Sequence, residues 1–188
     1  EPVGSTSRLL GTMGYAVGDD VAWALEGSIF SAGSAIQWLR DGLKVISESR
    51  QSEAMAQGLK DNGGVYLVPA LTGLGAPQWD PDARGSIFGI TRGTTKAHLA
   101  RASLEAIAFQ VRGLVDAISR DVGHGLTSLR VDGGAAASNL LLQTQADALG
   151  IPVIRGENLA ATGFGAAMLA GLGAGIWSDF DTLRGVFA

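Results

Sequence analysis

Cysteine does not occur in the 188-residue sequence, and histidine occurs only twice, at His98 and His124. The absence of cysteine excludes disulfide bonds, thiolate nucleophiles and cysteine-based zinc sites, and it fits a reducing compartment. The two histidines lie on different segments, without the short spacing that places two imidazoles on one metal ion. We therefore expect no metal site in this chain and ordinary surface or capping roles for both histidines.

Positive charge is also sparse, because 14 Lys and Arg residues stand against 18 Asp and Glu residues and give a formal net charge of -4. The sequence has no cluster of Lys and Arg that is dense enough to neutralise a nucleic-acid backbone. Nucleic acid is therefore not expected as a partner of this chain.

One long stretch, residues 159–177, has no charged residue and reaches the length that a helix needs to cross a bilayer. Its glycines and alanines contribute little transfer free energy, whereas small residues at Gly163, Ala167 and Gly171 let a helix lie close against another element. The stretch is predicted to form a buried helix of a globular protein, and no membrane is expected as a partner.

Internal repeats, low-complexity tracts and Pro/Ser-rich linkers are lacking, so the sequence predicts a single domain over residues 1–188. Residues 9–17 and 21–30 are predicted to form an antiparallel hairpin, because a Gly-Asp-Asp turn separates these two apolar runs. Two further strands are expected at residues 65–71 and 86–91, on either side of a loop rich in Gly, Pro and Asp.

Two helices are expected where apolar residues recur at three- and four-residue steps. The apolar stripe of the first helix is made of Ile36, Leu39, Leu43 and Ile46. Ser34 is the expected cap near its start. The second helix is the longest in the chain, and its stripe is made of Leu104, Ile107, Val111, Leu114 and Ile118. Thr95 is expected to cap this helix and the Gly123–Gly125 segment to end it.

A strand, a turn, a helix and a second strand are expected to follow one another in the last third of the chain. The strand is Leu129–Val131, the turn Asp132-Gly133-Gly134, the helix Asn139–Leu149 and the returning strand Ile151–Ile154. A connection of that length joins parallel strands by a right-handed crossover, so at least part of the sheet is expected to be parallel.

The Gly133-Gly134 turn is a candidate ligand site. Its glycines let a ligand approach the main chain without a Cβ in the way, and the amides that open the following helix attract polar or anionic groups. The alternative is that this segment only turns the chain, with Asp132 bonded to the turn amides. Both interpretations are compatible with the residues themselves.

Three segments carry a family resemblance. The first joins Ala24–Gly27 to Gly33–Asp41, the second is Thr72–Gly85, and the third combines Gly85–Ile90 with His98-Leu99 and Ala102–Glu105. Together they resemble the FGGY carbohydrate kinases over nearly the whole chain. The Gly-Leu-Gly-Ala-Pro loop in the second segment is similar to that of glycerol kinases and favours them over the xylulose and gluconate kinases of the same family.

The resemblance implies the actin-like, ribonuclease H-like ATPase fold, an α/β lobe with a mixed sheet flanked by helices. Residues 1–188 are then expected to be the C-terminal nucleotide-binding lobe, lacking its first strand and the N-terminal lobe. In the family, the general base is the aspartate of a Gly-Asp-Gln segment, and a Gly-Thr-Gly loop holds part of the phosphates. Neither segment occurs in the 188 residues, so no catalytic residue is assigned to this chain.

Carried over residue by residue, the resemblance places ATP or ADP against Gly33, Gln37 and the Gly133-Gly134 turn. Where glycerol kinases commonly have an asparagine that bonds the nucleotide, this sequence has Ser138, followed by Asn139. A serine hydroxyl can donate and accept a hydrogen bond but is shorter, so either a water intervenes or Asn139 takes part.

The reaction that the resemblance implies is transfer of the γ-phosphoryl group of ATP to a terminal hydroxyl of glycerol, giving glycerol 3-phosphate, with Mg²⁺ neutralising charge. This lobe would supply the adenosine side of the ATP site in a cytoplasmic enzyme, and the lobe alone is expected to be inactive. Homo-oligomer formation stays open. The competing hypothesis is a non-catalytic nucleotide-binding or regulatory module derived from a carbohydrate kinase.

Overall fold

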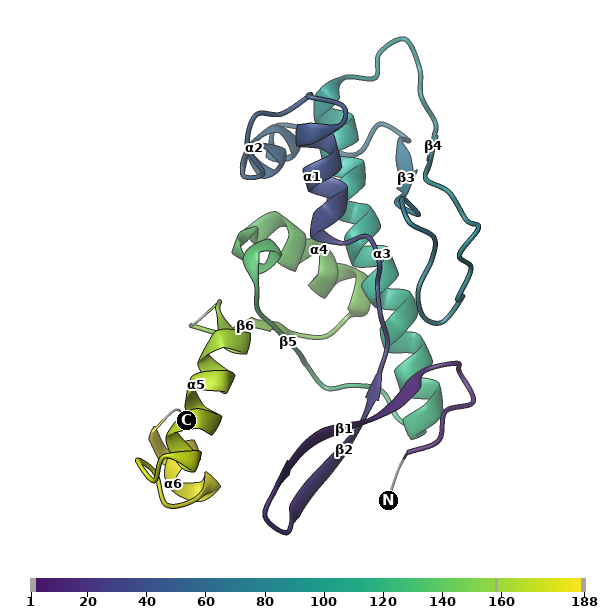
Figure 1. Cartoon of the computed structure of the whole chain (residues 1–188). Coiled ribbons are helices and arrows are strands. Elements are labelled where there is room, and N and C mark those ends of the chain that lie inside the picture. Colours follow the sequence, from purple (N-terminus) through teal and green to yellow (C-terminus); the bar gives the residue numbers. More distant parts are fainter. Residues whose placement is uncertain (1–2, 158, 187–188) are drawn as a thin grey trace.

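One long helix, α3 (Lys96–Val122), runs through most of the molecule, and the other elements are arranged along it (Figure 1). The structure is a computed structural model that describes residues 3–157 and 159–186. The remaining helices are α1 (Gly33–Asp41), α2 (Gln51–Gln57), α4 (Asn139–Leu149), α5 (Ala161–Gly173) and α6 (Phe180–Val186), together with the 3-10 turn η1 (Gly134–Ala137).

The strands are short except for the first two. They are β1 (Leu10–Val17), β2 (Asp20–Glu26), β3 (Tyr66–Val68), β4 (Ser86–Phe88), β5 (Leu129–Val131) and β6 (Val153–Arg155). Within the described part of the chain they pair as three two-stranded sheets, antiparallel for β1-β2 and β3-β4 and parallel for β5-β6. The predicted α/β class, hairpin and parallel crossover are confirmed, with both strand directions spread over three small sheets.

The predicted boundaries of α3 are confirmed. Thr95 lies at the N-cap in extended conformation, and its amide donates to Nδ1 of His98 at 3.1 Å, so His98 has a capping role. Gly123 ends the helix with a φ of 77° in the left-handed region, which glycine adopts without the penalty of a Cβ.

The first helix differs from its prediction at both ends. Ala32 is its N-cap and has no side-chain acceptor, so the prediction that Ser34 caps the helix is wrong. The helix ends at Asp41, because the amide of Leu43 bonds to the carbonyl of Trp38, five residues back, at 2.9 Å and so departs from the four-residue pattern of an α-helix. Leu43 is therefore exposed beyond the helix, whereas Ile46 reaches the core from the loop that follows.

The core lies where α1, α2 and α4 pack on α3. Its main cluster of buried side chains comprises Ile36, Leu39, Ile46, Ala56, Ala100, Leu104, Ile107, Ala108 and Leu141. A second cluster, around Val65 and Leu67, packs β3 on the same helix. The four helices thereby form one body, in which α3 holds the amino-terminal ends of α1, α2 and α4 in fixed relative positions.

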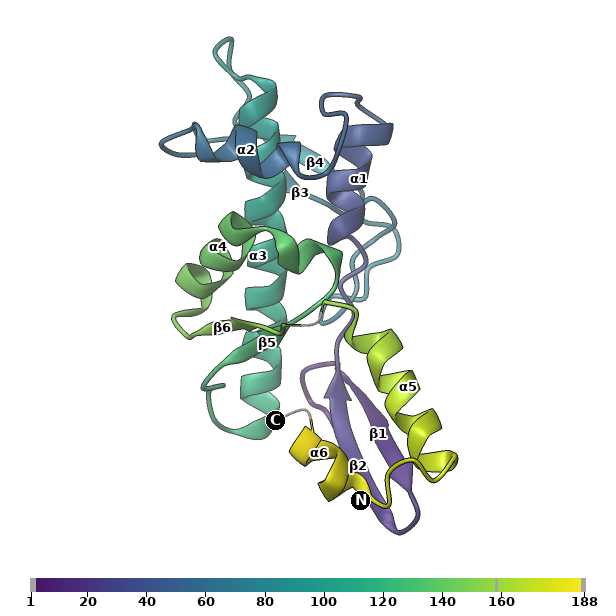
Figure 2. The ribbon, with the colours of Figure 1, turned by 90° about the vertical axis from the view of Figure 1, so that its left-hand side faces the viewer.

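The opposite end of the molecule is packed less densely. The hairpin β1-β2 lies beside α5 and α6 (Figure 2), and the rings of Tyr15 and Phe180 meet there with centroids 5.3 Å apart. Gly171 is the one buried residue that the structure describes within α5, and Leu169 is 50% exposed. The prediction of a buried helix over residues 159–177 is therefore wrong as to burial, because few elements of this chain cover α5.

Among the described residues no helix is both long and apolar enough to cross a membrane.

Candidate functional site

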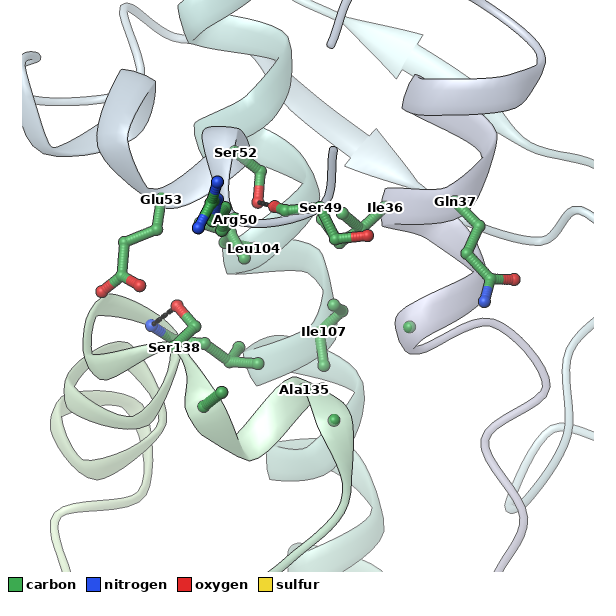
Figure 3. A pocket seen from close by; sticks show the side chains of 14 residues that line it. Ile36, Gln37, Ser49, Arg50, Ser52, Glu53, Leu104, Ile107, Ala135 and Ser138 are labelled. Carbon is green, nitrogen blue, oxygen red and sulfur yellow. Dashed lines mark hydrogen bonds between the residues drawn. The ribbon is translucent and has the colours of Figure 1, made fainter. Parts of the chain in front are cut away.

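A cavity of about 540 Å³ opens between the ends of α1, α2 and α4 and the middle of α3 (Figure 3). Its lining residues are Gly33, Ile36, Gln37, Ser49, Arg50, Ser52, Glu53, Leu104, Ile107, Gly134, Ala135, Ala137, Ser138 and Leu141. A volume of this size lies within the range of about 300 to 1,000 Å³ that is usual for small-molecule sites. The cavity is large enough for one nucleoside-sized ligand.

The floor of the cavity is apolar and rigid. It is made of buried side chains from three helices, Ile36, Leu104, Ile107 and Leu141, which also belong to the main core cluster. Because these side chains are held on the other side by the core, they cannot rearrange without disturbing the packing of all three helices. The floor offers a fixed apolar surface against which a flat ring can pack.

Four of the predicted site residues line this one cavity. Gly33 and Gln37 come from α1, whereas Gly134 and Ser138 come from η1 and the start of α4. In Figure 3, Gln37 and Ser138 lie on opposite sides of the opening. The structure thus brings together two segments that are far apart in the sequence.

The two glycines of the turn have different roles. Gly133 has a φ of 80°, a left-handed conformation that side chains rarely adopt, and its amide donates to the carbonyl of Leu159 at 2.9 Å. It therefore shapes the turn and does not line the cavity. A Cβ added at Gly134 would meet no atom within 4 Å, and the same is true of Gly33. The space beside both lining glycines is open to a ligand.

Asn139 is directed to a partner outside the cavity. Its side-chain oxygen accepts from Nη1 of Arg155 at 2.8 Å, and the same nitrogen donates to the carbonyl of Ala136 at 3.2 Å. These bonds tie the end of β6 to η1. The structure therefore does not bring Asn139 to the lining, although Ser138, its neighbour, belongs to it.

Two backbone amides at the start of α4 already have side-chain acceptors. Oγ of Ser138 accepts from the amide of Leu141 at 3.2 Å, and Oε1 of Glu53 accepts from the amide of Leu140 at 2.8 Å. These two amides are therefore not free, contrary to the expectation that free amides at this helix start attract polar or anionic groups.

One wall of the cavity was missed from the sequence. It consists of Ser49, Arg50, Ser52 and Glu53, at the start of α2, a helix for which no prediction was made. The run Glu53-Ala54-Met55-Ala56-Gln57 consists of strong helix formers and is the signal that indicates α2. With only seven residues, α2 is too short for a clear apolar period.

Positive charge on the described lining of the cavity is limited to one exposed arginine. Among the described lining residues, Arg50 alone carries a cationic side chain, and its Nε donates to Glu48 at 2.6 Å. The hydrogen bond to Glu48 raises the pKa of Arg50, so the guanidinium stays charged and paired. Because the Arg50 side chain is 84% exposed, this pair is a weak surface pair. Three or more His, Cys, Asp or Glu side chains do not gather into a possible metal site anywhere in the described residues.

A family profile, the C-terminal domain of the FGGY family of carbohydrate kinases, matches residues 2–174. The glycerol kinase of Koribacter versatilis is 56% identical over 177 residues, which are 94% of this chain and 36% of that protein. The glycerol kinase of Dechloromonas aromatica is also 56% identical, over 178 residues. The chain therefore spans about a third of the length of these relatives.

Solved structures show the same likeness. A Plasmodium falciparum glycerol kinase with ADP has a TM-score of 0.85 at 37% identity, covering 100% of this chain and 37% of that one. A gluconate kinase from Lactobacillus acidophilus has a TM-score of 0.75 at 26% identity, with coverage of 100% and 38%. Both similarities extend over all of the elements that build the cavity.

Proposed function

The chain belongs to the FGGY family of carbohydrate kinases, with the actin-like ATPase fold, and on that premise we propose that its cavity binds the adenosine half of ATP and ADP. One observation carries the proposal. Gly33 and Gln37 from α1 and Gly134 and Ser138 from the η1–α4 segment, the residues that the family resemblance indicates, line one cavity.

The chemistry of the lining supports the adenosine half rather than the phosphates. The buried floor offers apolar surface to a base, and the open space beside Gly33 and Gly134 lets a ring or a ribose approach the main chain. The hydroxyl of Ser138 and the carboxamide of Gln37 can donate and accept hydrogen bonds at the rim. Arg50 is the one cationic residue among the described lining residues, and it is largely exposed and paired with Glu48, so the cavity has little positive charge for a triphosphate.

In the proposed reaction, a whole kinase containing this lobe transfers the γ-phosphoryl group of ATP to a terminal hydroxyl of glycerol and releases ADP and glycerol 3-phosphate. Mg²⁺ would neutralise the developing charge on the phosphates. The described residues have no cluster that suits this ion, so it would be held by the phosphates and by other parts of the enzyme. The role of this lobe is to orient the nucleotide, which lowers the entropic part of the barrier.

The proposed domain organisation is a C-terminal nucleotide-binding lobe, residues 1–188, that packs against a first strand and an N-terminal lobe. The exposed apolar residues of the hairpin and of α5 support this, since Met13 and Leu169 are each about half exposed. The absence of cysteine also favours a reducing compartment, and we place the kinase in the cytoplasm.

Calorimetry of ADP binding to the whole kinase tests the site, with Gly134→Val as the variant. The new side chain meets no protein atom within 4 Å but occupies the space given to the ligand, so we expect a loss of about 1 to 3 kcal/mol in binding free energy. Gly163→Val is the matched control, because Gly163 also has open space around it and lies in α5. Unchanged ADP affinity in Gly134→Val would rule out this site.

A further inference from the structure

Glu53 links two walls of the cavity. Its side chain extends from α2 toward the start of α4 (Figure 3), where Oε1 accepts from the amide of Leu140 at 2.8 Å. The same oxygen accepts from Nε2 of Gln57, one turn along α2, at 3.1 Å. The carboxylate is thus held by its own helix and reaches across to the next wall.

The bond to Leu140 acts on the segment that carries two proposed ligand contacts. Leu140 is the second residue of α4, directly after Ser138 and Asn139, and Gly134 lies in the turn just before them. An amide at a helix start has no partner within the helix, so a side-chain acceptor that satisfies it holds it in one place, and loss of that acceptor leaves a part-buried donor unpaired. A shift of α4 away from α2 would break this bond and would move Ser138 and Gly134 with it.

Resting on the proposed function, we propose that Glu53 is a positioning residue for nucleotide binding, which acts through the Leu140 amide and fixes the distance between the α2 wall and the η1–α4 wall. Glu53 lines the cavity, but this role needs no contact with the nucleotide. A second consequence is that the carboxylate occupies the helix start, so the phosphates are not taken up there. The feature that matters is the acceptor oxygen and not the negative charge.

Three variants of the whole kinase test this role. Glu53→Ala removes the acceptor, whereas Glu53→Gln keeps an acceptor oxygen at nearly the same place and removes only the charge. Gln57→Ala is the matched control, because it removes the other donor to Glu53 and leaves Leu140 untouched. For each protein we would measure the Kd of ADP, the KM of ATP, kcat at saturating ATP, and hydrogen exchange at the Leu140 amide.

We expect Glu53→Ala to weaken ADP binding about tenfold, or about 1.4 kcal/mol. The KM of ATP should rise by about the same factor, while kcat stays near its value in the unmodified kinase. Glu53→Gln should recover ADP affinity to within about threefold, and Gln57→Ala should stay within about twofold of the unmodified kinase. Exchange at Leu140 should become faster in Glu53→Ala alone.

Equal weakening by Glu53→Ala and Glu53→Gln would overturn the inference, since the charge and not the bond would then matter. Unchanged ADP affinity in Glu53→Ala, with faster exchange at Leu140, would also overturn it. Failure of the proposed function has a different signature, because ADP affinity would then be unchanged in Gly134→Val as well as in Glu53→Ala. In that case the exchange of Leu140 still reports whether Glu53 holds α4.

Discussion

The two ends of α3 are covered very differently, although both carry apolar elements (Figure 1). Around its first half, α1, α2 and α4 bury Leu39, Leu104 and Leu141 to 3% exposure or less. Beyond its second half, the hairpin and α5 leave Leu169 50% and Ile176 71% exposed. Among the described residues only a small cluster, Leu9, Ala76 and Ala117, is buried at the second half of α3, so large apolar side chains are mostly buried at the first end and more often exposed at the other.

This difference separates the end of the chain that has its own apolar core from the end that needs other segments of the kinase to cover it. Burial of apolar surface is the main source of folding free energy, so the helical end has its own core. The cavity rests on that core, since Ile36, Leu104, Ile107 and Leu141 belong to both. In the described part of the chain, the hairpin end has only the small cluster of Leu9, Ala76 and Ala117, and in the proposed kinase other segments cover its exposed apolar residues. Nucleotide binding is expected to depend on the first end and catalysis on both.

The largest expected effect is the loss of turnover when the chain is studied alone. We expect the 188-residue chain to phosphorylate no glycerol and to bind ATP little better than adenosine. Two charge-assisted hydrogen bonds to phosphate at about 1.5 to 3 kcal/mol each would be missing, which is about a hundred- to ten-thousandfold in affinity. A coupled assay and calorimetry measure both quantities, and light scattering checks that the sample is monomeric. ATP affinity far above that of adenosine in a confirmed monomer would contradict this expectation.

The next-largest expected effect is on the free energy of unfolding, and it compares one leucine from each end of the molecule. Leu39 is 1% exposed within the main core cluster, so Leu39→Ala should lower the free energy of unfolding by about 2 to 5 kcal/mol. Leu169 is 50% exposed, so Leu169→Ala should change it by no more than about 0.5 kcal/mol. Denaturant unfolding of the chain measures both variants. Similar losses in the two would mean that α5 is packed as tightly as α1.

Much of the helical end could be predicted from the sequence, because the signals there are local. The boundaries of α3 follow from Thr95, Gly123 and the long apolar period between them. The strand, turn and helix around the Gly133-Gly134 pair were also predicted, and they place Gly134 and Ser138 at the cavity. Local periodicity and turn residues are sufficient for elements of this kind.

The remaining features depend on contacts that the local sequence does not encode. The end of α1 is set by the bond from the amide of Leu43 back to the carbonyl of Trp38, which interrupts an apolar period that continues in the sequence. The acceptor at the start of α4 is Glu53, far away in the chain. The exposure of α5 depends on which elements lie beside it, and residues such as Leu169 look equally suited to a core.

A smaller effect concerns Asp121, which ties the segment before the hairpin to the end of α3. Its carboxylate accepts from the hydroxyl of Ser5, from the amide and hydroxyl of Thr6 at 3.1 and 2.8 Å, and from the amide of Ser7 at 3.0 Å. These bonds, with that of Ser5 first, lower the pKa of Asp121 from 3.8 to about 2. A lowered pKa stabilises the folded state above pH 3.8, and this stabilisation is lost as the pH falls toward 2.

Thermal unfolding of the chain and of Asp121→Asn at several pH values tests this connection. The variant should melt at a lower temperature than the unmodified chain at pH 7, and the difference should shrink as the pH falls from about 4 to about 2. Asp147→Asn, on an exposed position of α4, is the control and should have less effect at each pH. A constant difference across this range would mean that Asp121 does not act through its charge.

Hydrogen exchange of the whole kinase with and without ADP tests the central claim most directly, because it reports on both ends of α3 in one experiment. We expect ADP to protect amides in residues 33–37 and 134–141, which line the cavity, and to leave residues 10–26 and 161–173 unchanged. Protection of the hairpin and α5, with none at the cavity, would contradict the assignment of the adenosine site to this lobe.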